Sequence, residues 1–539
     1  MYKSNETIKH IVFAGFCCAL FIHLAFTFTG FYGDDDINYV RYAADIAKNG
    51  VPEQLATSHF QLRWTVIYVT AFFFKIFGVS SFTSTLCSFL SVIGSGFLLS
   101  RILFKYPLFV YCFSLLLFFF AYSNIFYMQR TLPDATVCFA ILWMFYSYRS
   151  NVEQQTKFFS YGVQFSLALM LAIISKESII IALPLFLILL LNDLLKRINK
   201  RFWLTAIAAL LILVTAYLLY FKITTGSLFF RYNLLQAGSY LSECSYDMLP
   251  FSNTLRRVGY ELWKNMLVNG DMLILLPALT AFIYKKKFKS YVEVNDLNFS
   301  AFVILLLAAN FMTISFTHYV PLCPAPRHFL FLLPFAAIIG GPMMFAFFTK
   351  PKQFLLLPLF MAIATIVMFY IQAGNNKYLY LLFSCLLIAR LIMPFFINSK
   401  ISFSIAVIGF TALFSLNFLI DFIQPKYPYY KNHKELVERS IRYKNITGTL
   451  FSSDQLSGEL TEFFLDFNSN QLRILPMDSI LPNISGNLYY INVADINKSN
   501  QGRIDSLINY NKLEILLIDR EKNVSLYKLN NNMLDQLKD

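Results

Sequence analysis

Charged residues are scarce in this sequence: they make up 14% of 539 residues, whereas about 25% is usual in soluble proteins. The sequence also lacks a Cys-x-x-Cys motif, a Cys/His spacing typical of zinc sites, internal repeats and low-complexity tracts. No basic stretch interleaved with aromatic residues stands outside the apolar segments, which argues against nucleic-acid binding. Hydrophobic residues reach 57%, with 59 Phe and 32 Tyr, and the mean hydropathy is +0.55. This composition argues against a wholly soluble protein and predicts a polytopic all-α membrane protein.

A helix that crosses a bilayer needs about 20 mostly apolar residues. The sequence predicts about thirteen spans, at residues 11–30, 82–100, 107–122, 132–148, 159–175, 178–192, 202–221, 271–284, 299–317, 328–348, 354–372, 377–397 and 402–421. The first is too long for the core of a signal peptide and is interpreted as an uncleaved span. Residues 64–78 are also apolar, and we interpret them as an interfacial helix that lies along the membrane.

The distribution of charge fixes the predicted topology. The net charge is +14, and residues 425–539 hold 14 basic and 14 acidic residues, so the excess lies in the membrane part. With the N-terminus inside, every cytoplasmic loop carries Lys or Arg, as the positive-inside rule requires. Counting residues 64–78 as a span would invert all later loops. The prediction is therefore a multi-pass protein of the inner (plasma) membrane with an extracytoplasmic C-terminus.

The composition changes abruptly after Gln424. A Pro/Tyr-rich linker leads into short apolar runs typical of strands, which alternate with helix-like stretches near 455–467 and 503–510. The expected strands are Thr449–Ser453, Leu488–Val493, Leu513–Ile518 and Ser525–Leu529. We therefore expect a membrane domain over 1–424, with its first external loop at 31–81, and a small extracytoplasmic α/β domain over 425–539.

Three adjacent carboxylates follow the first span in Gly33-Asp34-Asp35-Asp36. The residues after them have helical periodicity, so the cluster could simply begin a surface helix, whose N-terminus favours acidic residues. Alternatively, crowded carboxylates beside a membrane suit a general base or a metal ligand. Both interpretations stay open, and so does a divalent cation as a cofactor.

Further ionisable residues stand where predicted spans end. Arg130 and Asp134 flank Pro133 at the fourth span and could form an ion pair that anchors the helix end. Lys176 and Glu177 join two spans almost without a loop, where a tight turn needs polar residues. Ionisable residues at membrane depth are nevertheless functional candidates by default.

Arg63 and the pair Arg327-His328 are the remaining ionisable candidates near the predicted spans. Arg327-His328 follow a Pro-rich loop and open the tenth span, and Arg63 precedes the interfacial helix, where it could snorkel to lipid headgroups. In the predicted topology all the candidates map to one membrane face: Asp34, Asp35, Asp36, Arg63, Arg130, Asp134, Lys176, Glu177, Arg327 and His328. Independent anchors would be expected on both faces. Sugar transfer from a phosphate needs this combination, because a carboxylate deprotonates the acceptor hydroxyl while cations hold the departing phosphate.

Short motifs in roughly the first 400 residues resemble the GT-C superfamily of membrane glycosyltransferases, in particular the bacterial lipid A aminoarabinose transferases and the protein O-mannosyltransferases. They are Asp34-Asp35 with Arg41-Tyr42-Ala43, Lys75-Ile76-Phe77-Gly78, Pro133-Asp134, and Arg327 followed by Pro334. The resemblance implies juxtamembrane helices in the first external loop, a polyprenyl-phosphate sugar as donor, and Asp34 or Asp35 at the catalytic position. The aminoarabinose transferases carry an acidic-Lys-Pro-Pro-like sequence where this chain has His59-Phe-Gln-Leu-Arg63, so the identity of the donor sugar does not carry over.

The sequence thus predicts a glycosyltransferase that moves a sugar from a polyprenyl phosphate to an acceptor in the cell envelope (lipid, glycan or protein). Asp34 or Asp35 would be the base, and Arg63, Lys176 and Arg327 would lie near the phosphate. The remaining candidates for substrate binding are Asp36, Arg41, Arg130, Asp134, Glu177 and His328. The alternatives are a transporter or flippase of lipid-linked glycans, against which the absence of repeats argues, and an O-antigen-type ligase or polymerase. A disulfide between the loop cysteines Cys244 and Cys323 is a further hypothesis.

Overall fold

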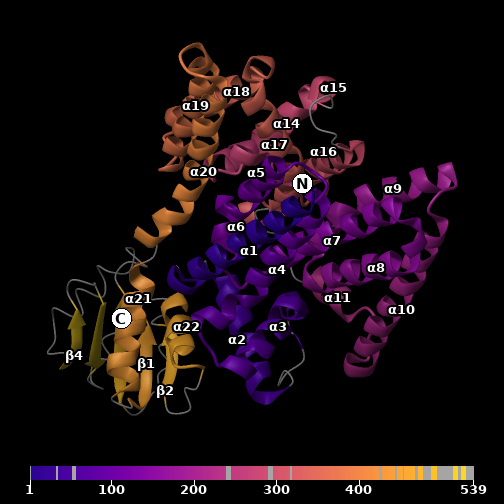
Figure 1. Ribbon diagram of the computed structural model, residues 1–539. Coiled ribbons are helices and arrows are strands. Elements are labelled where there is room, and N and C mark those ends of the chain that lie inside the picture. Colours follow the sequence, from indigo (N-terminus) through magenta and orange to yellow (C-terminus); the bar gives the residue numbers. More distant parts are fainter. Residues whose placement is uncertain are drawn as a thin grey trace. The chain divides into compact units, whose positions relative to one another are not determined.

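The structure is a computed structural model of the whole chain (Figure 1). It describes residues 2–28, 30–31, 34–50, 56, 58–237, 245–288, 295–315, 318–423, 428–443, 446–452, 455–467, 472–476, 487–493, 514–519 and 524–529. The chain divides into two compact units. The first unit comprises Met1–Phe26, Gln54–Val66 and Thr85–Ile423, and the second comprises Thr27–Glu53, Ile67–Ser84 and Gln424–Asp539.

Each of the thirteen predicted spans falls on a helix, although the ends are shifted by several residues. The helices are α1 (Tyr2–Phe26), α4 (Ser81–Leu103), α5 (Leu108–Phe119), α7 (Asp134–Glu153), α8 (Phe158–Ser175), α9 (Leu183–Lys196), α10 (Lys200–Thr225), α14 (Met272–Ile283), α16 (Asp296–Phe311), α17 (Leu332–Thr349), α18 (Leu356–Tyr370), α19 (Asn376–Ile392) and α20 (Ser399–Ile423). Among the described residues, eight helices are long and apolar enough to cross a membrane, and shorter apolar helices accompany them. The prediction of a polytopic helical membrane protein is confirmed.

Shorter elements connect these helices. The apolar stretch at 64–78 forms α3, and its interfacial placement stays a prediction. The connecting helices are α3 (Trp64–Phe77), α6 (Tyr122–Tyr127), α11 (Phe230–Ala237), α12 (Phe251–Arg256), α13 (Leu262–Val268) and α15 (Lys285–Phe288). The 3-10 turns are η1 (His59–Leu62), η2 (Gln155–Lys157), η3 (Glu177–Ala182), η4 (Tyr246–Met248), η6 (Pro326–Phe329), η7 (Pro351–Gln353) and η8 (Met393–Phe395), and η5 (Arg257–Glu261) is a π-helical turn.

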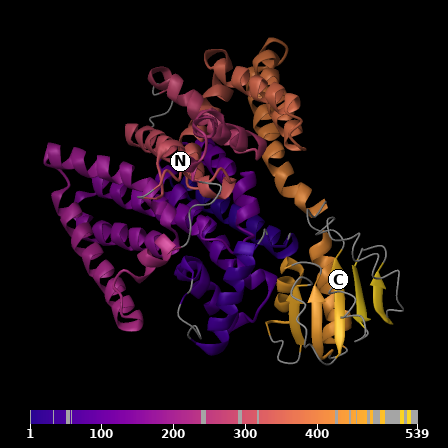
Figure 2. The same cartoon turned by 180° about the vertical axis from the view of Figure 1, so that it is seen from behind.

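Small residues let helices of the first unit approach closely, as is usual for helices in lipid. A Cβ added at Gly96 of α4 would overlap the ring of Phe119 on α5, and one at Gly341 of α17 would overlap Ser114 of α5. Helix α8 packs against both α7 and α10. Helices α8, α9 and α10 lie side by side in both views (Figures 1 and 2).

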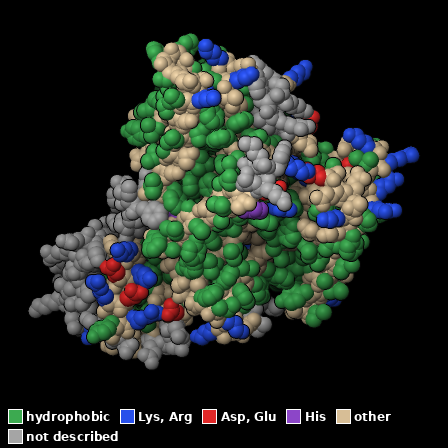
Figure 3. Space-filling view, viewed as in Figure 1, with side chains coloured by type: hydrophobic (Ala, Val, Ile, Leu, Met, Phe, Trp, Pro, Cys, Tyr) green, Lys and Arg blue, Asp and Glu red, His purple; other side chains and the backbone are tan. Residues whose placement is uncertain are grey.

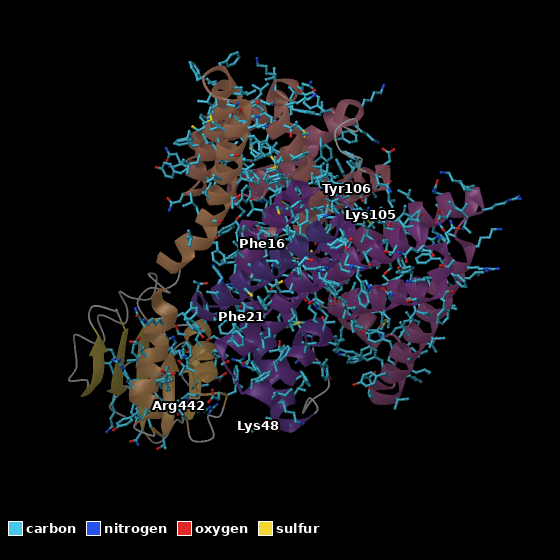
Figure 4. The ribbon with its side chains drawn as sticks, in the orientation of Figure 1. Phe16, Phe21, Lys48, Lys105, Tyr106 and Arg442 are labelled. Carbon is cyan, nitrogen blue, oxygen red and sulfur yellow. The ribbon has the colours of Figure 1, made fainter. Side chains whose placement is uncertain are left out.

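The surface of the first unit agrees with burial in lipid. Apolar side chains cover most of the helical surface in Figure 3, and Lys and Arg gather at the turn between α9 and α10. Lys105 and Tyr106 lie side by side in the loop after α4 (Figure 4). The Nζ of Lys9, on α1, donates to the carbonyls of Phe104 and Tyr106 in this loop, each at 2.7 Å. These two hydrogen bonds connect α1 to the loop.

The second unit contains a five-stranded sheet with the order β2-β1-β3-β5-β4. The strands are β1 (Gly448–Ser452), β2 (Leu472–Pro476), β3 (Leu488–Val493), β4 (Glu514–Asp519) and β5 (Val524–Leu529). Strand β1 pairs in parallel with β2 and β3, and β5 pairs antiparallel with β3 and β4, so that Leu450 lies opposite Tyr489 and Tyr490 opposite Tyr527. Four strands match the prediction and β2 was missed. The predicted helix at 503–510 lies outside the described residues.

Helices α21 (Pro428–Leu436) and α22 (Gln455–Phe464) pack on this sheet, and the π-helical turn η9 (Val437–Arg442) follows α21. Figure 1 shows α21 in front of the strands and Figure 2 shows the strands from the other side. Helix α2 (Asp34–Asn49) contacts α22 through ion pairs of Arg41 with Glu462 (2.7 Å) and Glu459 (3.6 Å). Residues after the first span therefore group with the C-terminal segment, while the predicted domain boundary near 425 stays a prediction.

Candidate active site

Lys176 and Asp134 form a buried ion pair in the first unit. Helix α8 ends at Ser175, and Lys176 takes an extended conformation before η3 begins at Glu177. Helix α7 begins at Asp134, directly after Pro133, as a proline at a helix start implies. The Nζ of Lys176 donates to Oδ1 of Asp134 at 2.6 Å, while the buried Oδ2 has no hydrogen-bond partner among the residues that the structure describes. Lys176 was expected near a phosphate, and its partner in the structure is a carboxylate 42 residues away.

Glu177 lies between two arginines. Its Oε1 is 2.7 Å from Nη2 of Arg231, and its Oε2 is 3.4 Å from Nη2 of Arg63. Arg63 in turn stacks over the ring of Phe60, with 4.5 Å from its Cζ to the ring centroid. Arg231 on α11 was missed by the sequence analysis. Its position beside Phe229 and Phe230 could have identified it as a candidate, because a cation in an apolar stretch requires a partner.

Arg327 and His328 form a third contact, in η6. The Nδ1 of His328 is 3.0 Å from the carbonyl of Cys323, and the Nε of Arg327 is 3.2 Å from Nε2 of His328. A carbonyl can only accept, so Nδ1 carries the proton and Nε2 accepts from the guanidinium. His328 is therefore a neutral side chain that orients Arg327.

Electrostatic interactions join these three contacts into one group, which we call the basic cluster: Arg63, Asp134, Lys176, Glu177, Arg231, Arg327 and His328. Asp134 interacts with Lys176, His328 and Arg327. Lys176 lies between two candidate spans, and burial lowers its pKa to about 8; Asp134 opposes this shift, whereas Arg63 and Arg327 add to it. The described residues of the basic cluster include four cations and two carboxylates, so the cluster has a surplus of two positive charges. The cations are Arg63, Lys176, Arg231 and Arg327, and the carboxylates are Asp134 and Glu177. Such a site suits an anion.

The other predicted residues have contacts of their own. Arg130 is fully buried, donates to the carbonyl of Gln129 (3.3 Å) and lies over the ring of Phe126 at 4.4 Å. The three carboxylates of the acidic motif begin α2 in the second unit, where Asp36 is buried and Asp35 half-buried. Arg41 also belongs to that unit and binds two glutamates of α22. The predicted place of these residues beside the basic cluster stays a prediction.

Two expectations about bound metal and disulfides remain untested. Within the described residues, no group of three or more His, Cys, Asp or Glu side chains is arranged to hold a metal ion. The side chain of Asp34 is not among them, so the divalent cation stays open. Cys244 lies outside the described residues, and its pairing with Cys323 stays a prediction.

No protein-family model matches the sequence, and no curated protein matches it. Solved structures do match. The crystal structure of ArnT from Cupriavidus metallidurans bound to undecaprenyl phosphate is similar with a TM-score of 0.62 and 13% identity, over 96% of this chain and 97% of that one. The chain has a GT-C-like fold. The structure of the same ArnT in the apo state matches over the same shares of both chains, with a TM-score of 0.60 and 13% identity.

The GT-C-like fold confirms the fold implied by the short motifs of the first 400 residues. An identity of 13% shows the fold alone. The roles of the site residues therefore depend on the chemistry of the basic cluster and on experiment.

Proposed function

We propose that this protein transfers a sugar from a polyprenyl-phosphate-linked donor to an acceptor in the cell envelope, on the extracytoplasmic side of the membrane. The observation that carries the proposal is the basic cluster, with its surplus of two positive charges inside a GT-C-like fold. The similar ArnT structure bound to undecaprenyl phosphate supports a lipid phosphate as the ligand.

The charge of the cluster fits the reaction. A sugar joined to a polyprenyl phosphate is a phosphodiester with one negative charge. When the bond from the anomeric carbon to the phosphate oxygen breaks, the released polyprenyl phosphate carries about two negative charges at neutral pH. Arg63, Lys176 and Arg327 would stabilise this developing charge more than the ground state, which is how an enzyme accelerates the chemical step.

The acceptor would attack the anomeric carbon directly. Its hydroxyl proton would pass to Asp34 or Asp35, and the new glycosidic bond would form as the phosphate departs. Asp134 would hold Lys176 in place through its 2.6 Å contact, and Arg130 would shape the surroundings of the site. The sugar, pentosyl or hexosyl, and the acceptor are left to experiment.

Binding of undecaprenyl phosphate to the purified protein tests the proposal. Lys176→Met and Arg327→Gln should each weaken binding by about tenfold or more, because a charge-assisted contact to phosphate is lost. Arg256→Gln is a matched control, since Arg256 is an exposed arginine paired with Glu261. Transfer from polyprenyl-phosphate sugars, with and without EDTA, would establish activity and metal dependence. A wild-type protein that binds no polyprenyl phosphate would overturn the proposal.

A further inference from the structure

Glu177 is shared unequally by two arginines. Arg231 contacts it at 2.7 Å and Arg63 at 3.4 Å. Arg231 is also held by two other groups, because its Nη1 donates to the carbonyl of Ile173 at 2.7 Å and to the hydroxyl of Tyr217 at 3.0 Å. Ile173 lies on α8 and Tyr217 on α10, so hydrogen bonds to two helices hold the Arg231 guanidinium in place. All three charged side chains are buried or nearly so, with 7%, 12% and 9% exposure for Arg63, Glu177 and Arg231.

The contact of Glu177 with Arg63 conflicts with phosphate binding. A phosphate oxygen on the Arg63 guanidinium would stand within a few ångströms of the Glu177 carboxylate, and like charges repel strongly where water is scarce. A phosphate on Arg63 would therefore compete with the contact between Arg63 and Glu177. Glu177 would then stay buried with its charge, which is unfavourable unless another cation balances it. Arg231 is placed to do so.

We propose that Arg231 is a positioning residue that retains Glu177 when Arg63 turns to the donor phosphate. The proposal rests on the proposed function and adds to it a residue that touches neither the phosphate nor the sugar. In the donor-free protein Glu177 contacts Arg63 at 3.4 Å and partly offsets its buried charge. On binding, the pair Glu177–Arg231 persists and the pair Glu177–Arg63 is replaced.

A double-mutant cycle on undecaprenyl phosphate binding tests this exchange. Arg231→Gln leaves Glu177 with Arg63 as its cationic partner, so binding should weaken by about tenfold or more, in line with the loss of one partner of a buried charge pair. Glu177→Gln removes the competing carboxylate, so binding should be at least as tight as in the wild type. The double variant should recover most of the affinity lost in Arg231→Gln.

The transfer reaction gives a second measurement. Because Arg231 acts on donor binding alone in this proposal, Arg231→Gln should raise KM for the donor and leave kcat at saturating donor little changed. Thermal unfolding of each variant shows whether it is folded, and Arg231→Lys replaces Arg231→Gln if the latter is not. The lysine keeps the charge with fewer contacts, so it should weaken binding less than tenfold.

The outcomes separate the hypotheses. If the double variant binds as weakly as Arg231→Gln or more weakly, Arg231 contacts the phosphate itself or supports the fold, and the exchange is wrong while the proposed function stands. The exchange is also wrong if Arg231→Lys binds undecaprenyl phosphate as tightly as the wild type while Glu177→Gln binds it more weakly than the wild type. If the wild type binds no polyprenyl phosphate, both the proposed function and the exchange are overturned.

Discussion

At the scale of single residues, each charge of the basic cluster is held by another member of the cluster. Asp134 pairs with Lys176, Glu177 pairs with Arg63 and Arg231, and His328 accepts from Arg327. Removing one partner of a buried charge pair is far more damaging than changing an exposed pair. Loss of binding and loss of folding must therefore be measured separately in every variant of this cluster.

The base is expected to be Asp34 or Asp35. We predict that Asp34→Asn and Asp35→Asn leave the protein folded and that at least one of them loses nearly all transfer activity. Loss of a general base typically lowers the rate by about 10²–10⁴, whereas loss of a helix cap costs about 0.5–2 kcal/mol of stability. Turnover of a polyprenyl-phosphate sugar and thermal unfolding distinguish the two roles. Near-normal turnover in both variants would make the acidic motif structural.

We expect Lys176 to make the binding of undecaprenyl phosphate dependent on pH. Its pKa is lowered to about 8, mainly by burial, so the side chain loses its charge as the pH rises through that value. Binding of undecaprenyl phosphate should weaken above about pH 8, because the phosphate stays a dianion there. Arginine keeps its charge up to about pH 12, so Lys176→Arg should remove this decrease. Titration of affinity against pH in both proteins provides the measurement, and parallel curves would exclude Lys176 as the cause.

At the scale of elements, the turn between α9 and α10 is held by one buried carboxylate. Asp193 accepts from the Tyr148 hydroxyl (3.1 Å), the Asn199 amide (2.9 Å) and the Trp203 indole (2.9 Å). Arg197 and Asn199 adopt left-handed backbone conformations with φ of 57° and 53°, which non-glycine residues rarely do. The network fixes this strained turn and presents its exposed basic residues.

Asp193→Ala should therefore destabilise the protein measurably. It leaves buried donors without an acceptor, and each such group costs about 1–3 kcal/mol. The matched control is Asp45→Ala, which removes a half-buried carboxylate whose hydrogen bond from Asn49 (2.7 Å) is exposed. It should change stability by less than about 0.5 kcal/mol. Thermal unfolding in detergent compares them. Equal unfolding temperatures would show that the turn does not depend on Asp193.

At the scale of the whole molecule, the predicted topology is testable by labelling. The basic loops predict that the turn after α14 lies in the cytoplasm and the C-terminal segment outside. Intact cells treated with a membrane-impermeant thiol reagent should modify a cysteine at Tyr443, which is 85% exposed, and not one at Lys286. Native cysteines are distinguished by peptide mapping. Modification at Lys286 alone would invert the topology and move the proposed reaction to the other side.

The sequence by itself determined the positions of the apolar helices and of most strands, because these depend on local composition. Runs of about 20 apolar residues predicted the helices of the first unit, because lipid requires each span to satisfy its own backbone hydrogen bonds. Alternating short runs after residue 424 predicted four of the five described strands. Strand β2, with the sequence Leu-Arg-Ile-Leu-Pro, was missed because it is short and contains a charge and a proline.

The tertiary structure decided which charges meet. Lys176 and Asp134 are 42 residues apart, and Arg63 and Glu177 are 114 residues apart. Hydropathy and spacing identified these side chains as unusual but could not pair them, because an ion pair depends on how distant helices pack. Arg231 entered the basic cluster only in this way, through its contacts with α8, α10 and Glu177. Arg41 contacts two glutamates of α22 in the folded chain, and its role in substrate binding stays a prediction.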